Sequence, residues 1–491
     1  MNSAARLIDT AADAGIILHS RAGRLICAVT GPQPGSDLLE ALRAHKQDIL
    51  QHLRDGGLAL PTRSADVECS MPLSPLKASI YYEHLLNPDG NAYNMGFFVK
   101  VLGHFDCEAW SFAWRRLLAR HCDLRSLFTE EDGCLRQWVL ADIEPPLTHV
   151  DLSSFPAEQQ VAALESITAA TLDAPFDLAS KIPLRLCVAV LAPQTHVLAL
   201  CLHHIVADAD SLVILMHQLR EAYSAFAPLA PADPQVSSLA DATYSVQHHT
   251  WVKSDQCTRY LRQWCDEVRG APALFPLNAV PPGHDVERIP LSIPETLMEQ
   301  LLQIGRSHCF TAFQITLAAF ARTLAQTAHQ SDVLIGVPVR IMAGAVASDA
   351  VGCFVNLLPV RLRPLEFDDP LALLDRVRFR MQDCLTRAEV PLQSIRQCLA
   401  AERRGPPPAI QAVLTFTTQT PAFGDWPGLQ FQNLQSRVSQ GKFGLNLQLH
   451  LSEGRCRGTV ELGPQASGVR GMDGFGEAFV AQLRWLAARA A

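Results

Sequence analysis

Residues 195–208 read Thr-His-Val-Leu-Ala-Leu-Cys-Leu-His-His-Ile-Val-Ala-Asp, an apolar run that ends in a polar segment. The apolar part follows the polar pair Pro193-Gln194, which is typical of a buried β-strand. Because successive side chains of a strand point to opposite faces, His203 and His204 leave it on opposite sides. Asp208 follows closely enough to return to the same site as an orienting partner.

A strand that carries an imidazole into a loop supplies a positioned base, which indicates acyl transfer. Paired histidines at a strand end also occur as packed structural residues. The spacing alone therefore leaves both interpretations open.

Composition limits the class of protein. The chain has 491 residues, 48% of them hydrophobic and 18% charged, which predicts several folded domains and little disorder. A net charge of −8 argues against a nucleic-acid or anionic-membrane surface. No continuous apolar window predicts a membrane span, and Asp9 and Asp13 interrupt any signal-peptide core, so we expect a cytoplasmic protein.

Cysteine and histidine patterns give no metal signature. The 14 cysteines include no Cys-x-x-Cys pair, and the 17 histidines include no His-Glu-x-x-His. We expect reduced thiols and no bound metal.

Residues 1–56 predict a small α-β-β-α-α unit. Apolar positions recur at helical spacing over residues 4–18, among them Leu7 and Ala11. Two short strands, Ile16–Ser20 and Arg24–Val29, follow. Ser36 is suited to cap a helix whose buried positions are Leu38, Leu39 and Leu42, and the helical pattern continues over His45–Leu53.

This unit resembles the N-terminal docking domain first described on tubulysin-type megasynthases. The resemblance rests on Gly15–Leu18, Gly23–Leu25 and the Leu-x-x-His-Lys-x-x-Ile-Leu helix at 42–50. It implies that the hairpin edge captures the C-terminal tail of an upstream synthase subunit as an added strand, with charge pairs selecting the partner. The implied docking residues are Leu18, Arg24, Leu25, Ile26 and Lys46. A generic capping subdomain is the alternative.

Residues 57–70 predict a linker, because Gly57 and Pro61 break helices and no apolar period is present. Helical and strand patterns alternate beyond it and predict an α/β body of two lobes, residues 71–235 and 236–491. The Pro/Ala/Ser-rich stretch 228–238 bridges them. Continuous helices are expected over Trp251–Val268 and Ser307–Ala328. Two similar lobes predict an active site in the cleft between them.

Five motifs of this body resemble the condensation domain of nonribosomal peptide synthetases. Three agree well: Arg120-His121 with Leu124-Arg125 and Phe128, His203-His204 with Asp208, and Val351–Leu358. The opening motif at Ser74–Tyr81 and the late strand at Lys442–Leu447 agree in part. Departures from the family pattern include Lys77, Ala209 in place of Gly, and Gly444 in place of Asp.

The resemblance implies a chloramphenicol-acetyltransferase-like, pseudo-dimeric two-lobe fold with a tunnel. A donor acyl thioester and an acceptor aminoacyl thioester enter on the phosphopantetheine arms of two carrier proteins and leave as an amide. No permanently bound cofactor is implied. A downstream adenylation domain in a longer chain is a further implied partner, and we expect this sequence to be the N-terminal piece of such a synthetase.

The resemblance also implies residue roles. His204 accepts the amine proton or holds the attacking lone pair in line, and His203 packs behind it and holds the loop. Asp208 is structural. Its implied partner is Arg340 or another residue, because Met342 occupies the usual Arg position.

Further support is assigned to Arg125 and Asn356. Ala209, Asp210 and Ser211 line the loop, and backbone N–H groups near Ala209 or Asp210 are candidates for oxyanion stabilisation. If Ala209 had to adopt positive φ, its Cβ would cost about 1 kcal/mol.

Alternative functions remain at this stage. An ester-forming domain with a hydroxyl acceptor and a noncatalytic recruitment domain are both open. A heterocyclising relative is disfavoured because that branch replaces the histidine pair by an Asp-x-x-x-x-Asp pattern. An epimerase is disfavoured because it follows a carrier, and a starter domain because free acyl-CoA needs no docking unit.

Overall fold

The structure of the protein is a computed structural model. It describes residues 7, 10–11, 16–21, 24–29, 36–49, 67–131, 134–141, 143–226, 240–275, 286–341, 349–402, 409–419, 423–424, 426–438, 443–466, 469 and 471–490. The chain divides into two compact units. Unit 1 comprises residues 1–253, 342–354 and 421–439, and unit 2 comprises residues 254–341, 355–420 and 440–491.

These units differ from the two predicted lobes in two ways. Helix α8 (Ala240–Val252) belongs to unit 1, where it contacts α4 (Pro75–Leu86) and β3 (Val67–Pro72). Two later segments, 342–354 and 421–439, also fold with unit 1. Composition marked the boundary at 235/236, but composition cannot detect a segment that returns to an earlier sheet. The division into functional domains stays a prediction.

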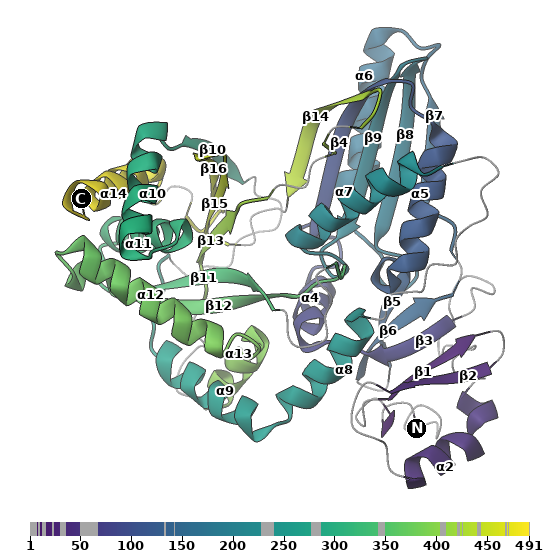
Figure 1. Ribbon diagram of the computed structural model, residues 1–491, viewed down its shortest axis with the longest axis horizontal. Helices are drawn as coiled ribbons and strands as arrows, with labels where there is room; N and C mark the ends of the chain where they lie inside the picture. Colours follow the sequence, from purple (N-terminus) through teal and green to yellow (C-terminus); the bar gives the residue numbers. More distant parts are fainter. Residues whose placement is uncertain are drawn as a thin grey trace. The chain divides into compact units, whose positions relative to one another are not determined.

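The main sheet of unit 1 contains the predicted histidine strand. Its order is β14-β4-β9-β8-β7 (Figure 1). The strands are β14 (Leu429–Val438), β4 (Asn94–Gly103), β9 (Thr195–His203), β8 (Leu184–Ala192) and β7 (Leu147–Asp151). Helices α5 (Cys107–Arg120) and α7 (Ala209–Ser224) contact each other beside it, and α6 (Ala157–Thr168) contacts β8. The apolar stripe of α5, which includes Trp110 and Trp114, is buried in the core of this unit.

Strand β14 reaches this sheet from much later in the sequence, as its yellow-green colour beside the blue β4 shows in Figure 1. It pairs antiparallel with β4 from Leu429↔Gly103 to Val438↔Met95. Buried aromatic residues anchor its start, with Trp426 and Phe423 packed against Trp110.

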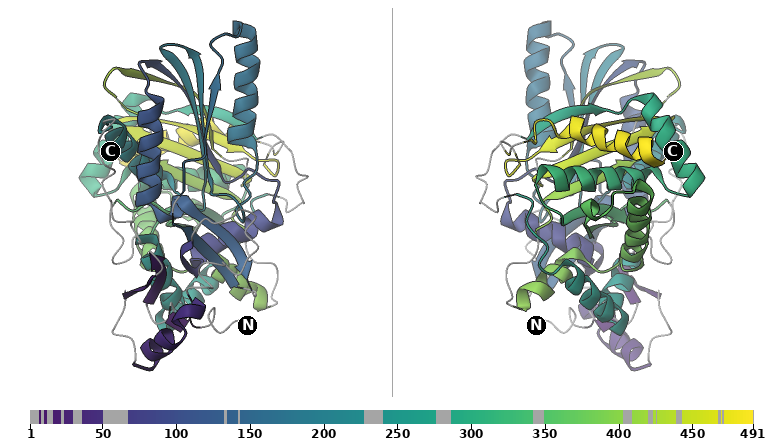
Figure 2. Two further views of the ribbon diagram at one scale, coloured as in Figure 1. Left: turned by 90° about the vertical axis from the view of Figure 1, so that its right-hand side faces the viewer. Right: turned by 90° about the vertical axis from the view of Figure 1, so that its left-hand side faces the viewer.

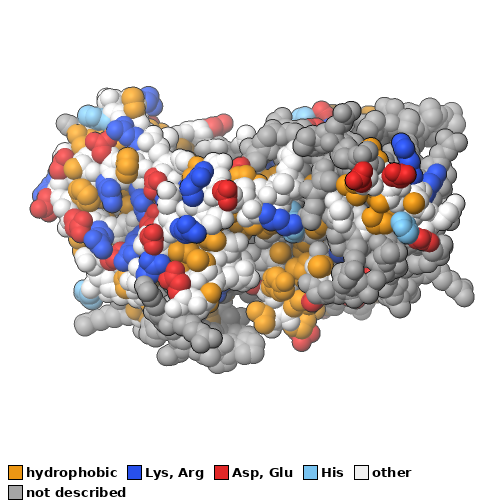
Figure 3. Space-filling model, turned by 90° about the horizontal axis from the view of Figure 1, so that it is seen from below, with side chains coloured by type: hydrophobic (Ala, Val, Ile, Leu, Met, Phe, Trp, Pro, Cys, Tyr) orange, Lys and Arg blue, Asp and Glu red, His pale blue; other side chains and the backbone are white. Residues whose placement is uncertain are grey.

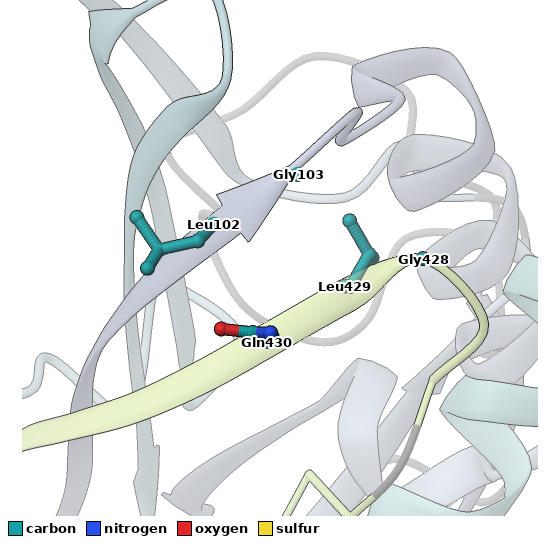
Figure 4. Close-up of a pocket in the computed structure, with 5 residues that line it drawn as sticks. All are labelled: Leu102, Gly103, Gly428, Leu429 and Gln430. Atoms are coloured by element: carbon teal, nitrogen blue, oxygen red, sulfur yellow. The ribbon is translucent and has the colours of Figure 1, made fainter.

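The start of β14 lies against the end of β4 at two glycines, Gly428 and Gly103. Gly103 has φ 120°, and a Cβ there would lie 2.2 Å from the carbonyl oxygen of Gly428. Only glycine allows this approach. The two glycines line a surface hollow with Leu102, Leu429 and Gln430 (Figure 4). His203 lies at the other end of β4, because it pairs with Asn94 whereas the hollow lies at Gly103.

A second sheet of unit 1 has the order β2-β1-β3-β6-β5. The predicted N-terminal hairpin is present as β1 (Ile16–Arg21) and β2 (Arg24–Val29), and β1 also pairs with β3 at His19↔Cys69. The other two strands are β6 (Cys134–Leu140) and β5 (Ser126–Glu131). Among the described strands, β2 therefore ends the sheet, and β1 lies between β2 and β3.

The N-terminal helices form a small core of their own. Leu42 and Ile49 are buried with Ala11, and Leu7, Leu38 and Leu39 pack against them. These are positions that helical spacing predicts. Helix α2 is Ser36–Ala44. The identity of the unit as a docking domain stays a prediction.

Unit 2 contains one sheet of order β10-β16-β15-β13-β11-β12. Its strands are β10 (Glu287–Ser292), β16 (Arg455–Leu462), β15 (Leu445–Ser452), β13 (Ala412–Thr417), β11 (Val333–Arg340) and β12 (Val355–Leu362). Its helices are α9 (Asp255–Val268), α10 (Glu295–His308), α11 (Ala312–Thr327), α12 (Pro370–Thr386), α13 (Leu392–Ala401) and α14 (Phe475–Ala490). The yellow α14 packs along α11 (Figure 2).

Two helices that the sequence predicted as continuous are interrupted in the structure. The expected helix 307–328 is interrupted, because Cys309 adopts left-handed φ 58° and ends α10. Thr311 and Gln314 then form a capping box that begins α11. The expected helix 251–268 breaks before Ser254, whose side chain accepts from Cys257 N and caps α9.

Among the described residues on the face in Figure 3, Lys and Arg side chains lie among Asp and Glu side chains. No helix in the described part of the chain is long and apolar enough to cross a membrane.

Candidate active site

The histidine pair lies where β9 ends and the chain turns into α7. Backbone hydrogen bonds hold the turn: His204 N donates to Tyr93 O at 2.8 Å, and His203 N donates to Pro183 O at 3.1 Å. Helix α7 begins at Ala209. The strand, the turn and the helix therefore hold the backbone on both sides of His204.

His203 is a packed residue. Its side chain is buried, and its ring contacts His84, Tyr93 and Phe176 at centroid distances of 5.8, 5.6 and 5.7 Å. Ile205 N donates to its Nδ1 at 3.2 Å, so that nitrogen is unprotonated. Burial, followed by the nearby His84, His204 and Arg185, holds the pKa of His203 well below its usual range. His203 is therefore neutral at physiological pH, and its Nδ1 holds the backbone of the loop through Ile205 N.

His204 is partly exposed and lies beside two side chains. The ring of Tyr93 meets it edge-on, at 6.4 Å and 90° between ring planes. The hydroxyl of Tyr93 donates to Glu83 at 2.5 Å. On another side, Nδ1 of His204 lies 3.7 Å from Sγ of Cys353. The accessible imidazole of the pair is therefore that of His204.

Cys353 could not be found from the sequence motifs. It occupies the variable position between Gly352 and Phe354 in the motif at 351–358, so the motif gives it no weight. Nothing in the sequence pairs it with a histidine so far away along the chain.

Asp208 joins helix α7 to residues 352–354. Its Oδ1 accepts from Ser211 N at 2.8 Å, and its Oδ2 accepts from Phe354 N at 3.2 Å. Ser211 Oγ lies 2.7 Å from Asp208 Oδ1 and 2.8 Å from Gly352 O, and it accepts from Gly352 N at 3.1 Å. Asp208 thus caps the helix and ties down the backbone next to Cys353.

The predicted strain at Ala209 is absent. Ala209 is the first residue of α7 and is not one of the described non-glycine residues with positive φ. Its Cβ is compatible with this conformation, so replacement of Gly costs no backbone strain. Ala209 and Asp210 are exposed, whereas Ser211 is buried.

The unusual Lys77 has a buried partner. Its Nζ donates to both carboxylate oxygens of Asp123 at 2.8 Å and lies 3.2 Å from Gln137 Oε1. Gln137 Nε2 also donates to Asp123 at 2.7 Å. The departure at position 77 is therefore matched by an acid at position 123. A Cβ on Gly352 would lie 2.9 Å from Asp123, so this pair lies directly against the Cys353 segment.

Two predicted supporting residues are buried and bonded. Arg125 donates to Leu118 O at 3.0 Å and forms an ion pair with Glu68 at 2.6 Å. Asn356, in unit 2, donates to Ala388 O and Val390 O at 2.8 and 2.7 Å. Arg340 is the last residue of β11 in unit 2, and its pairing with Asp208 stays a prediction.

Gly444 in place of Asp also has a physical reason. A Cβ at Gly444 would lie 2.6 Å from the ring of Phe275, which is buried. Leu274 N and Phe275 N both donate to Gln411 Oε1, at 2.7 and 3.1 Å, and these hydrogen bonds hold the backbone that carries the Phe275 ring. An aspartate cannot occupy this position without displacing Phe275.

The predicted docking residues lie on the N-terminal elements. Leu18 is on β1, and Arg24, Leu25 and Ile26 are on β2, with Leu18 opposite Cys27. Lys46 is exposed in the turn-and-helix segment after α2. Within the described residues, no group of three or more His, Cys, Asp or Glu could hold a metal ion.

Comparisons with known proteins identify the family. The condensation-domain family matches residues 67–459. The chain belongs to the condensation-domain family. The family comprises the peptide-bond-forming acyltransferase domains of nonribosomal peptide synthetases, so the predicted enzyme class is confirmed.

Two synthetases illustrate the similarity of this condensation domain to longer proteins. Phosphinothricin tripeptide synthetase PhsB of Streptomyces viridochromogenes is 27% identical over 427 residues, which cover 83% of this chain and 35% of that one. Bacitracin synthase 3 of Bacillus licheniformis is 26% identical over 407 residues, which cover 82% of this chain and 6% of the synthase. The chain therefore spans only a minor part of either relative.

Solved structures share the two-lobe α/β fold. The condensation domain of the Monacolin K polyketide synthase MokA matches with a TM-score of 0.72 and 19% identity, covering 87% of this chain and 99% of that one. The X-domain from teicoplanin biosynthesis matches with a TM-score of 0.70 and 20% identity, covering 85% of this chain and 94% of that one.

Proposed function

We propose that this condensation domain joins a carrier-bound acyl or peptidyl donor to a carrier-bound aminoacyl acceptor, with His204 as the base. The observation that carries the proposal is the difference in burial and hydrogen bonding between the two histidines. His203 is buried and neutral, with Nδ1 already accepting a hydrogen bond, whereas His204 is accessible at the loop.

The chemistry balances with this residue. The amine nitrogen attacks the donor thioester carbonyl, a C–N bond forms, and the C–S bond to the phosphopantetheine arm breaks. The amine proton passes through His204 to the departing thiolate. An α-amine has a pKa near 8, so a neutral imidazole is a suitable acceptor, and positioning supplies much of the remaining gain. Phosphopantetheine belongs to the carriers, and the domain needs no cofactor of its own.

The surrounding residues support the loop rather than react. Asp208 and Ser211 hold the start of α7, and Arg125 and Asn356 bind backbone carbonyls within their own units. Amides of Ala209 or Asp210 are the proposed donors to the oxyanion. The chloramphenicol-acetyltransferase-like pseudo-dimer and the tunnel between the lobes are part of the same proposal.

The N-terminal unit, residues 1–56, is proposed to recruit an upstream synthase subunit. The β2 strand, with Arg24, Leu25 and Ile26, ends a five-stranded sheet and offers an edge for an added strand. Lys46 is exposed for a charge pair with that tail. An upstream carrier that lacks its native C-terminal tail should give less product. Unchanged turnover would contradict the docking role.

A single-turnover assay by intact-protein mass spectrometry tests the reaction. It combines donor-loaded and aminoacyl-loaded carriers with the wild type, with His204→Ala and with the control His217→Ala. His217 is an exposed residue on α7. Wild type and control should form product, and His204→Ala should be slower by about 10²-fold or more. Equal rates would mean that His204 is not an essential base.

Recruitment without catalysis is the second candidate. The similar teicoplanin X-domain was solved in complex with OxyB, which is a binding partner of that domain. Carrier binding without product, over a panel of carriers, would favour recruitment. Product from a hydroxyacyl acceptor but not from an aminoacyl acceptor would instead identify an ester-forming domain.

A further inference from the structure

Cys353 lies against the proposed base. Its Sγ is 3.7 Å from Nδ1 of His204, within the range of a hydrogen bond to sulfur. Both residues belong to unit 1. Nδ1 is therefore the ring nitrogen that faces the sulfur.

The backbone around Cys353 is held from three directions. Gly352 is bonded to Ser211 Oγ through both its N–H and its carbonyl. Phe354 N donates to Asp208, and the Phe354 ring is buried edge-on against Tyr244 at 5.4 Å. The backbone is therefore anchored on both sides of Cys353.

We propose that Cys353 is a positioning residue: its sulfur accepts the Nδ1–H of His204 and so keeps Nε2 unprotonated and aimed at the acceptor amine. This inference rests on the proposed function. In this proposal Asp208 acts on the base indirectly, because its carboxylate accepts from Phe354 N and so holds the backbone next to Cys353.

A sulfur acceptor suits this role. A base that must start neutral needs one fixed tautomer, with the proton on the nitrogen that faces away from the substrate. A carboxylate at this position would hold the tautomer, but it would also favour the imidazolium. Sulfur is a weak acceptor, so it orients the ring without that full charge.

Three variants test the proposal in the single-turnover and steady-state assays. Cys353→Ala removes the acceptor, Cys353→Ser keeps a smaller one, and Cys187→Ala is the control. Cys187 is a buried cysteine on β8 that faces Ala199 across the sheet. Cys353→Ala should lower kcat about 10-fold with the KM for the acceptor carrier unchanged. Cys353→Ser should recover most of that loss, and Cys187→Ala should match the wild type.

A second measurement does not depend on turnover. In protein labelled with ¹⁵N-histidine, the His204 signals are those lost in His204→Gln. Wild type should show His204 as the Nδ1–H tautomer, and Cys353→Ala should show a mixture. The Nε2–H tautomer in wild type would overturn the proposal, even if the variant is less active.

Other outcomes are equally decisive. Equal kcat for Cys353→Ala and the control would overturn the positioning role while leaving His204 as base. An acyl adduct on Cys353, found by mass spectrometry, would overturn it in favour of a covalent nucleophile. Absence of product with wild type would instead be a failure of the proposed function, and the tautomer measurement would still decide the role of Cys353.

Discussion

Buried charge is handled differently in the two units. In unit 1, Lys77 and Asp123 form an ion pair whose side chains are both 0% exposed. In unit 2, Arg387 binds Glu267 and Asp383, and the Asp383 side chain is 41% exposed. Removal of Arg387 leaves Glu267 paired with Arg380 and leaves Asp383 in contact with water, whereas removal of Lys77 leaves Asp123 buried without this cation. The unit that carries the histidine loop therefore depends more strongly on complete internal pairing.

The largest expected effect is that of breaking the unit 1 pair. Lys77→Met leaves Asp123 buried without its cation, which should lower the free energy of unfolding by about 3–5 kcal/mol. Hydrogen exchange of unit 1 peptides, followed by mass spectrometry, measures this loss locally. Since Asp123 lies against Gly352, the variant should also slow product formation.

Arg387→Met is the matched change in unit 2. Its loss should be about 1–2 kcal/mol, because Asp383 remains solvated and Glu267 keeps its ion pair with Arg380. The double variant Lys77→Met, Asp123→Leu should recover part of the loss in unit 1, since it removes the unpaired charge. If Lys77→Met cost no more than Arg387→Met, the contrast between the units would be lost.

A pH titration sharpens the same contrast. Burial lowers the pKa of His121 to about 4, and its Nε2 lies 2.6 Å from Gln218 Oε1. The unfolded chain takes up this proton near pH 6.5 and the folded unit only near pH 4. Stability should therefore decrease as the pH is lowered across that interval, by roughly 3 kcal/mol for this group.

The comparison is between wild type and His121→Gln, measured by denaturant titration from pH 7 to pH 4. The variant lacks the titrating group, so its stability relative to wild type should rise as the pH falls. A constant difference between the two proteins would contradict a buried neutral His121. A difference in the free energy of unfolding that is already present at pH 7 would report the change in packing only.

A steric change in unit 2 is expected to have a small effect. Gly444→Ala places a methyl group 2.6 Å from the buried ring of Phe275 and should cost about 1–3 kcal/mol. Gly474→Ala is the control, because nothing lies within 4 Å of a Cβ there. Thermal unfolding of both variants would measure the difference. Equal stabilities would show that Phe275 moves aside.

Much of the fold could be predicted from local patterns. Strand β9 was expected from its apolar run, because such a run bounded by polar residues is a local signal. The break between α10 and α11 was not expected, because a cysteine at position 309 gives no sequence signal for the left-handed φ that ends α10.

The site divides in the same way. The order and spacing of the motifs identified the family and the histidine pair, but the sequence placed Ala209, Asp210 and Ser211 in a loop, whereas they form the first turn of α7. The sequence could not show that Lys77 is matched by Asp123 or that Cys353 touches His204. It also could not show that β14 returns to β4. Local patterns report which face of an element is buried, whereas these contacts join residues far apart in the chain and exist only after packing brings them together.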